Sequence, residues 1–126
     1  MLKIKPIREK SEQERMCSLC GVEYKETHMA YGAYENEVPL GVSQFIIEGG
    51  AGYISEFAPV KGTFDDEAMF ILGRGVENFI DSVGAHDAYY GGGDTEFVRS
   101  LGFSEKDGKL YMDLSAFFAD PCKNKK

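Results

Sequence analysis

The apolar residues near the middle of the chain first alternate with polar ones and then recur at helical spacing. The segment Gly52–Ala58 alternates and is rich in β-formers, which predicts a strand. Its odd-numbered side chains, Tyr53 to Phe57, are expected on one face. The even-numbered ones, from Ile54 through Glu56, are expected on the other. A loop that contains proline and glycine follows and ends the strand.

A long amphipathic helix is predicted over residues 65–83. Its apolar side is formed by residues three and four apart, namely Ala68, Met69, Leu72, Val76, Phe79, Ile80 and Val83. Thr63 or Asp65 is expected to cap the first free amides, and the acidic residues 65–67 face the positive end of the helix dipole. Gly73 and Gly75 each cost about 1 kcal/mol relative to alanine, so we expect a close approach to a sheet or another chain there.

The first half of the chain predicts an antiparallel meander. Strands are expected at residues 2–7, 27–34 and 40–48, with a turn at residues 35–37 and a hairpin turn at Gly49-Gly50. Between the first two strands, a short helix is expected to begin at Ser11, with Glu14 completing a capping box.

The second half returns to the sheet after the long helix. Residues 85–90 are expected to form a strand parallel to residues 52–58, because a helical crossover joins them. Asp94 is expected to cap a second short helix that carries Phe97, Val98 and Leu101. A turn at residues 106–109 then leads into a final strand, predicted over residues 110–118.

Length and charge narrow the classes of protein. The 126 residues fit one domain, residues 1–126. The net charge of −7 argues against binding nucleic acid or an anionic membrane surface. No apolar run approaches the roughly 20 residues of a membrane span, and the N-terminus lacks a signal sequence, so a cytoplasmic location is expected. The three cysteines are expected to be reduced thiols.

Two features invite a chemical interpretation and also have a structural one. Cys17 and Cys20 form a CxxC, which could belong to a zinc site. Cys122 and His28, the residues that could complete such a site, lack the companion spacing, so no metal is expected. Cys17 and Cys20 are instead expected to be core residues. The seven tyrosines and nine phenylalanines suggest an apolar groove or a homodimer interface. The segment Phe117-Phe118 is a candidate for such an interface, and closure of the chain's own core is its alternative.

The order of elements resembles the GNAT acetyltransferase superfamily. The resemblance lies in the meander, in the strand and helix of residues 52–84, in Leu101-Gly-Phe103 after a short helix, and in the closing hairpin. It implies an α/β (α+β) fold, with a mixed, mostly antiparallel sheet of about six strands flanked by two or three helices. It also implies transfer of an acetyl group from acetyl-CoA to an amine on a small molecule, a protein N-terminus or a lysine.

The resemblance assigns a site to residues 56–62. Glu56 lies where some members carry the general base, which takes a proton from the amine through water. The backbone of Phe57, Ala58, Val60, Lys61 and Gly62 lies where such proteins hold the pantetheine arm and the pyrophosphate of the cofactor.

The chain departs from the family pattern at two places. The loop lacks the second glycine of the pattern, and Asp65, Asp66 and Glu67 follow it, where they would repel phosphates. Val98 occupies the position at which many members have a tyrosine that protonates the departing thiolate, while Tyr89, Tyr90 or Tyr111 could replace it. A second hypothesis therefore stays open, that of a non-catalytic relative that uses the cleft for another small ligand or for self-association.

Overall fold

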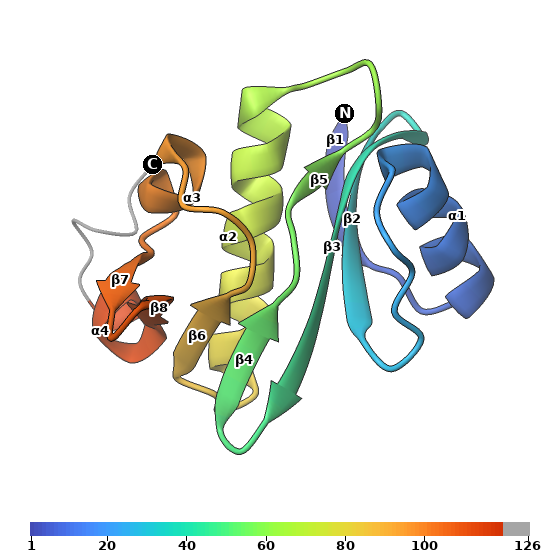
Figure 1. Ribbon diagram of the computed structural model, residues 1–126. Helices are drawn as coiled ribbons and strands as arrows, with labels where there is room; N and C mark the ends of the chain where they lie inside the picture. Colours follow the sequence, from blue (N-terminus) through green and yellow to red (C-terminus); the bar gives the residue numbers. More distant parts are fainter. Residues whose placement is uncertain (120–126) are drawn as a thin grey trace.

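The computed structural model describes residues 1–119, which form a mixed eight-stranded sheet and four helices (Figure 1). The strands are β1 (Leu2–Pro6), β2 (Met29–Glu35), β3 (Val38–Glu48), β4 (Ala51–Ile54), β5 (Ala58–Pro59), β6 (Asp87–Tyr90), β7 (Ser104–Lys106) and β8 (Lys109–Asp113). The helices are α1 (Lys10–Cys20), α2 (Asp66–Ser82), α3 (Glu96–Ser100) and α4 (Leu114–Ala119). The predicted class, a mostly antiparallel sheet with helices, is confirmed, with two more strands and one more helix than expected.

The strands lie in the order β1-β2-β3-β4-β6-β8-β7, and β5 pairs with β3 outside this path. The pair β4–β6 is parallel and the other pairs are antiparallel. The parallel pair is joined through α2, as the predicted crossover requires. The meander β1 to β4 and the hairpin β7–β8 are also confirmed.

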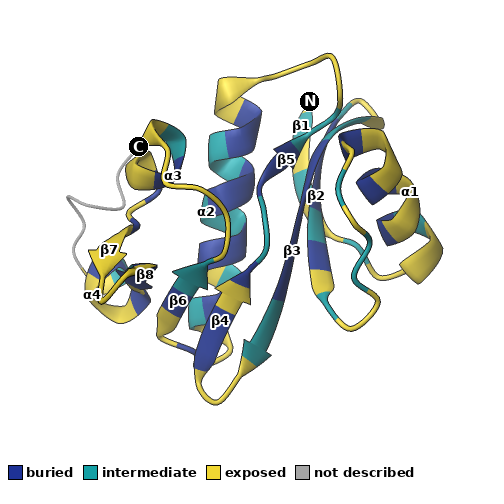
Figure 2. Cartoon of the chain, viewed as in Figure 1, coloured by how far each residue is buried: buried dark blue, intermediate teal, exposed yellow. Residues whose placement is uncertain are grey.

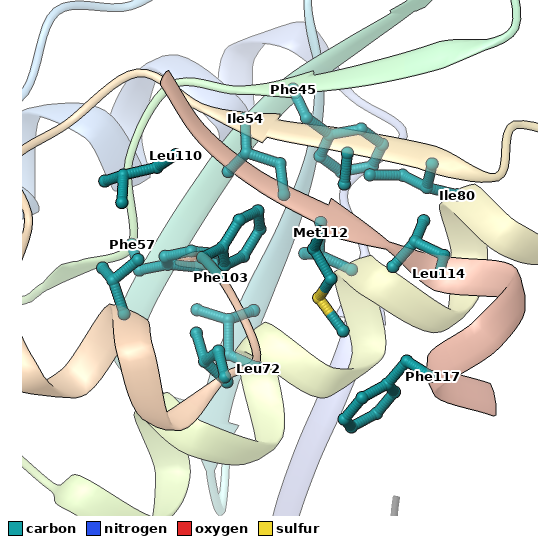
Figure 3. Packing of buried hydrophobic residues seen from close by; sticks show 14 of the residues in the cluster. Phe45, Ile54, Phe57, Leu72, Ile80, Phe103, Leu110, Met112, Leu114 and Phe117 are labelled. Carbon is teal, nitrogen blue, oxygen red and sulfur yellow. The ribbon is translucent and has the colours of Figure 1, made fainter. Parts of the chain in front are cut away.

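Helix α2 covers one face of the sheet and forms the main core with it. Asp65 caps the helix, because its side chain accepts a hydrogen bond from the Ala68 amide at 3.0 Å. In Figure 3, Phe45 and Ile54 from the sheet point toward Leu72 and Ile80 of the helix. Helix α3 and its C-cap residue add Val98 and Leu101 to the same core, and α4 adds Leu114 and Phe117. The predicted span of the long helix is thus confirmed to within one residue at each end.

Helix α1 lies on the opposite face and covers only part of it. Its buried Met16 and Cys20 pack on residues of β2, β3 and β5. No residue of α1 packs over β4, β6 and β8 in this cluster, and these strands contain exposed and half-buried residues (Figure 2). The predicted capping box is wrong, because the helix begins at Lys10 after Glu9, without a side-chain cap, and Ser11 lies inside it.

The two glycines of α2 meet neighbouring elements closely, as expected. A Cβ on Gly73 would lie 2.7 Å from the Leu101 side chain, and one on Gly75 would lie 3.1 Å from Ile4 of β1. The lost helix propensity is therefore offset by close packing against the end of α3 and the edge of the sheet.

The end of the chain differs from the prediction. The expected strand over residues 110–118 stops at Asp113, whose side chain accepts a hydrogen bond from the Ala116 amide and so begins α4. Phe117 is buried against α2, so its structural interpretation is confirmed. Asp94 does not cap α3. Thr95 does, while Asp94 forms an ion pair with Arg99.

Cys122 and the basic residues 123–126 lie outside the described part of the chain. Within residues 1–119, no helix is long and apolar enough to cross a membrane.

Candidate functional site

The strand predicted over residues 52–58 is broken in two, and the break opens the sheet. β4 ends at Ile54, and the Gly91 amide donates to the Ile54 carbonyl at 2.9 Å just beyond the last β4–β6 pair. After three residues that belong to no strand, β5 (Ala58–Pro59) continues along β3 alone. The chain after β6 has turned away by then, so one edge of β5 lies open. The sheet therefore has a V-shaped gap with its apex at Ile54 and Gly91.

The break is a bulge organised by Gln44 of β3. The backbone carbonyl of Gln44 accepts a hydrogen bond from the Ser55 amide at 2.9 Å, and the backbone amide of Gln44 donates one to Glu56 Oε2 at 2.8 Å. A carboxylate thus takes the place of the missing strand carbonyl. The bulge shifts the alternation, so that Ile54 and Phe57 both contribute to the core under α2. The predicted alternation of faces through this segment is therefore wrong.

Glu56 belongs to a buried polar network that supports the loop before β2. Burial raises the pKa of Glu56, while hydrogen bonds from the Gln44 backbone and side chain oppose this effect. Gln44 Oε1 accepts from the Lys25 amide at 2.8 Å and from Gln13 Nε2 at 2.9 Å. Gln44 Nε2 donates to the Glu23 carbonyl at 2.8 Å. Both glutamine side chains are fully buried, so the loop of residues 21–28 is tied to the bulge.

Two of the loop amides assigned to the cofactor, and that of Thr63 after them, already have partners. The Val60 amide donates to the Leu40 carbonyl, and the Lys61 amide donates to Leu19 at the end of α1. The Thr63 amide turns back to the Val60 carbonyl. The Lys61 side chain lies over Gly21, at the α1 end of the loop.

The start of α2 presents negative charge and aromatic rings. Asp65 uses its carboxylate as the helix cap, and Asp66 and Glu67 are exposed in the first turn. Phe64 is exposed beside them, and its ring meets Phe97 of α3 at 6.4 Å between centroids. The positive end of the helix dipole is thus partly balanced by the chain's own carboxylates.

Aromatic rings fill the α2 side of the gap. Phe57 stacks on Tyr90 with 5.3 Å between centroids, and the edge of Phe97 meets Phe57 at 6.1 Å. Burial raises the pKa of Tyr90, and a backbone hydrogen bond with Phe57 opposes this effect. Tyr90 therefore bridges the gap from β6 to the open edge beside β5.

A pocket of about 600 Å³ reaches the apex of the gap from the other face. Its lining includes Ile54, Ser55 and Gly91 at the apex of the gap, Tyr53 of β4 and Tyr89 of β6, and Lys109 of the β7–β8 hairpin. His28, from the loop held by Gln44, also lines it. Burial lowers the pKa of His28, which favours its neutral ring.

Val98, at the family's proton-donor position, and the three tyrosines that could replace it occupy different environments. Val98 is buried in the core and lies outside the pocket lining. Tyr111 donates to Asp87, and this hydrogen bond is the main cause that raises its pKa to about 12. Tyr89 lies between the rings of Tyr53 and Tyr111. Tyr90 is the candidate that lies at the apex of the gap.

The structure brings together residues that the sequence pattern did not single out. Ser55, rather than Glu56, lines the pocket, and Glu56 lies next to it in the buried network. Lys109 and Tyr53 carried no recognisable motif. Strand register could have grouped them, because pairing β4, β6 and β8 aligns the tyrosines.

The CxxC does not contribute to a site. Cys17 and Cys20 are free and buried, as the core interpretation requires. Burial raises the pKa of Cys17 to about 11 and that of Cys20 to about 12. Among residues 1–119, no three His, Cys, Asp or Glu side chains are grouped to hold a metal ion.

Comparison with known proteins identifies the fold. No protein-family model matches the sequence, and no curated protein matches it significantly. Among solved structures, the chain is similar to an IAA acetyltransferase from Bacillus cereus, with a TM-score of 0.72 and 14% identity over 90% of this chain and 99% of that one. The chain is also similar to a GNAT family acetyltransferase from Brucella melitensis in complex with acetyl-CoA. The TM-score is 0.70, and the identity is 16% over 90% of this chain and 88% of that one.

An N-acetyltransferase from Staphylococcus aureus gives a TM-score of 0.68 and 17% identity, over 91% of this chain and 99% of that one. The chain therefore has the GNAT fold, and the resemblance expected from its sequence is confirmed at the level of the fold.

Proposed function

We propose that this chain is a GNAT-type N-acyltransferase that moves an acetyl group from acetyl-CoA to an amine. The observation that carries the proposal is the gap beside β5, where an open strand edge and the pocket meet at Ile54 and Gly91. An extended donor arm with amide groups can form hydrogen bonds to such an edge, as added strands do. An amine in the pocket would then face the end of that arm.

The reaction forms a C–N bond and breaks a C–S bond, so the amine loses a proton and the sulfur gains one. Coenzyme A supplies the activated acetyl group as a thioester. Glu56 is a suitable acceptor for the amine's proton through water at Ser55, because its raised pKa strengthens it as a base. Tyr90 is a suitable donor, because it lies at the apex of the gap and its phenol is in the protonated form that burial favours.

The phosphate end of the cofactor meets a less suitable surface. The amides of Val60, Lys61 and Thr63 have internal partners, and the acidic residues 65–67 begin the helix behind them. Of the loop residues assigned to the cofactor, Gly62 retains the geometry of an open turn, with φ of 84° and free space around it. The assignment of residues 57–62 to the cofactor stays a prediction.

These same contacts favour a second candidate function. A non-catalytic GNAT-fold module that binds a small ligand without coenzyme A would tolerate bonded loop amides and carboxylates at the start of α2. The two candidates differ in one measurable property, which is affinity for acetyl-CoA.

Calorimetric titration with acetyl-CoA tests the proposal, with two matched variants. Gly62→Asp adds a negative charge beside the proposed phosphate site, whereas Gly50→Asp adds it in the β3–β4 turn. Both glycines have a positive φ, 84° and 81°, and free space around them, so the two changes carry a similar backbone cost. We expect micromolar binding that weakens at least about tenfold in Gly62→Asp alone. No heat at millimolar acetyl-CoA would favour the binding module instead.

Tyr90→Phe tests the proposed proton donor. The ring that stacks on Phe57 remains and only the hydroxyl is lost. With any accepted amine, we expect kcat to fall by about 100-fold or more while KM changes little. Release of the coenzyme A thiol can be followed with a thiol reagent. An unchanged kcat would remove Tyr90 from the mechanism.

A further inference from the structure

We propose that the pocket holds a free aromatic α-amino acid as the acceptor. Its ring would lie on Tyr53 and Tyr89, its carboxylate would pair with Lys109, and its amino group would lie at the Ile54–Gly91 apex. The acceptor role rests on the proposed acyltransfer, whereas the binding itself does not.

A row of tyrosines forms the surface for the ring. Tyr53, Tyr89 and Tyr111 are direct neighbours in the register of β4, β6 and β8. Their side chains project to the face that α1 leaves open, because Ile54 and Tyr90, the next residues, face the core under α2. Tyr53 and Tyr89 stack at 5.4 Å with only 13° between their planes. Tyr53 is 43% exposed, so a flat apolar platform faces the pocket.

Lys109 supplies the charge that the ligand must match. Two carboxylates also line the pocket, but Asp94 is paired with Arg99, and Glu105 accepts a hydrogen bond from the Gly108 amide. Lys109 has no ion-pair partner within residues 1–119, and its ammonium lies 5.7 Å from the centroid of the Tyr89 ring. A ligand with a carboxylate would give this lysine a partner.

The positions of the three subsites fit an α-amino acid. Tyr90 pairs with Leu110 at the end of the β6–β8 ladder, so Gly91 and Lys109 are the next residues beyond this pair, and both line the pocket. The apex and the lysine are therefore neighbours, as are an amino group and a carboxylate on one carbon atom. The tyrosine platform lies one residue before Ile54 on β4 and two residues before Gly91 on β6, where the ring of an aromatic side chain would extend.

The proposal is tested by binding without acetyl-CoA. We would titrate the protein with L-phenylalanine, with phenethylamine, which lacks the carboxylate, and with L-leucine, which lacks the ring. Ligand-detected NMR and calorimetry measure the affinities. We expect L-phenylalanine to bind at least about tenfold more tightly than either analogue, since each analogue loses one subsite.

Paired variants identify the residues. Lys109→Gln should lower the affinity for L-phenylalanine about tenfold and leave the affinity for phenethylamine unchanged. Lys106→Gln is the matched control, because Lys106 also lies over a tyrosine ring, Tyr111 at 4.5 Å, but does not line the pocket. Tyr53→Leu should remove the preference for L-phenylalanine over L-leucine. Circular dichroism verifies that each variant is folded.

The outcomes separate this inference from the proposed function. Lysine-dependent binding of L-phenylalanine without acetyl transfer would support the ligand class and contradict the acyltransferase. Acetyl-CoA binding, or transfer to other amines, with no preference for L-phenylalanine would overturn the ligand class alone. Equal loss of affinity in Lys106→Gln and Lys109→Gln would also overturn it, because the effect would then be one of net charge.

Discussion

Replacing Glu77 by glutamine is expected to remove much of the pH dependence of the protein's stability near neutrality. Glu77 lies in α2, and its side chain is 0% exposed. One carboxylate oxygen accepts from the Arg74 guanidinium at 2.8 Å, and the other has no hydrogen-bond partner among the described residues. A charged carboxylate in this position is only partly compensated.

The magnitude follows from the pKa. Burial raises the pKa of Glu77 from 4.5 to about 8, and Arg74 offsets only part of this rise. Between these values the folded protein keeps a proton that the unfolded chain has lost. The stabilisation is therefore complete below pH 4.5 and is lost as the pH rises through 8. Well inside this window each rise of one pH unit removes about 1.4 kcal/mol. The loss becomes smaller near pH 8, where the folded carboxyl is half ionised, so about 2 kcal/mol disappears between pH 6 and 8.

Urea unfolding at pH 6, 7 and 8 measures the effect. The wild-type free energy of unfolding should fall with pH more steeply than that of Glu77→Gln, since glutamine cannot ionise. Glu67→Gln, an exposed change in the same helix, should leave the wild-type slope unaltered. The upper limit of pH 8 avoids ionisation of Cys17 and Cys20 in the unfolded chain, where the usual thiol value is 9.0. Parallel curves for wild type and Glu77→Gln would refute the reasoning.

Two further predictions concern packing and the polar network. Gly73→Ala should lower the free energy of unfolding by about 1–3 kcal/mol, because overpacking against Leu101 exceeds the gain in helix propensity, while Gly75→Ala should cost less. A chemical unfolding series measures both, and a more stable Gly73→Ala would contradict the close contact. Gln44→Leu should cost about 2–4 kcal/mol and speed hydrogen exchange in residues 23–28, because the amide and carbonyl that it satisfies become unpaired. Unchanged exchange in that loop would show that the glutamine does not support it.

The parts of the fold that depend on local periodicity were predictable from the sequence. The spacing of apolar residues located α2. Thr63 or Asp65 was predicted to cap its start, and Asp65 does so. The Gly49-Gly50 turn and the crossover then defined how β3, β4 and β6 are connected.

The parts of the fold that depend on a partner strand were not predictable from the sequence. Residues 55–57 read as a regular strand until Gln44 is known to bond both the Ser55 amide and the Glu56 carboxylate. The tyrosine platform joins residues 53, 89 and 111, which only sheet register brings side by side. The start of α4 was a missed local signal, since Asp113 has the short acceptor side chain that begins helices.

The stacked tyrosines also give the molecule an optical probe of its own pocket. The chain has seven tyrosines and no tryptophan, so tyrosine emission is neither lost by energy transfer to tryptophan nor masked by tryptophan emission. Rings held as close as those of Tyr53 and Tyr89 couple their electronic transitions, which produces near-ultraviolet circular dichroism that depends on the angle between them. Events at this platform can therefore be observed in the unlabelled protein, without attaching a dye that would itself occupy the surface.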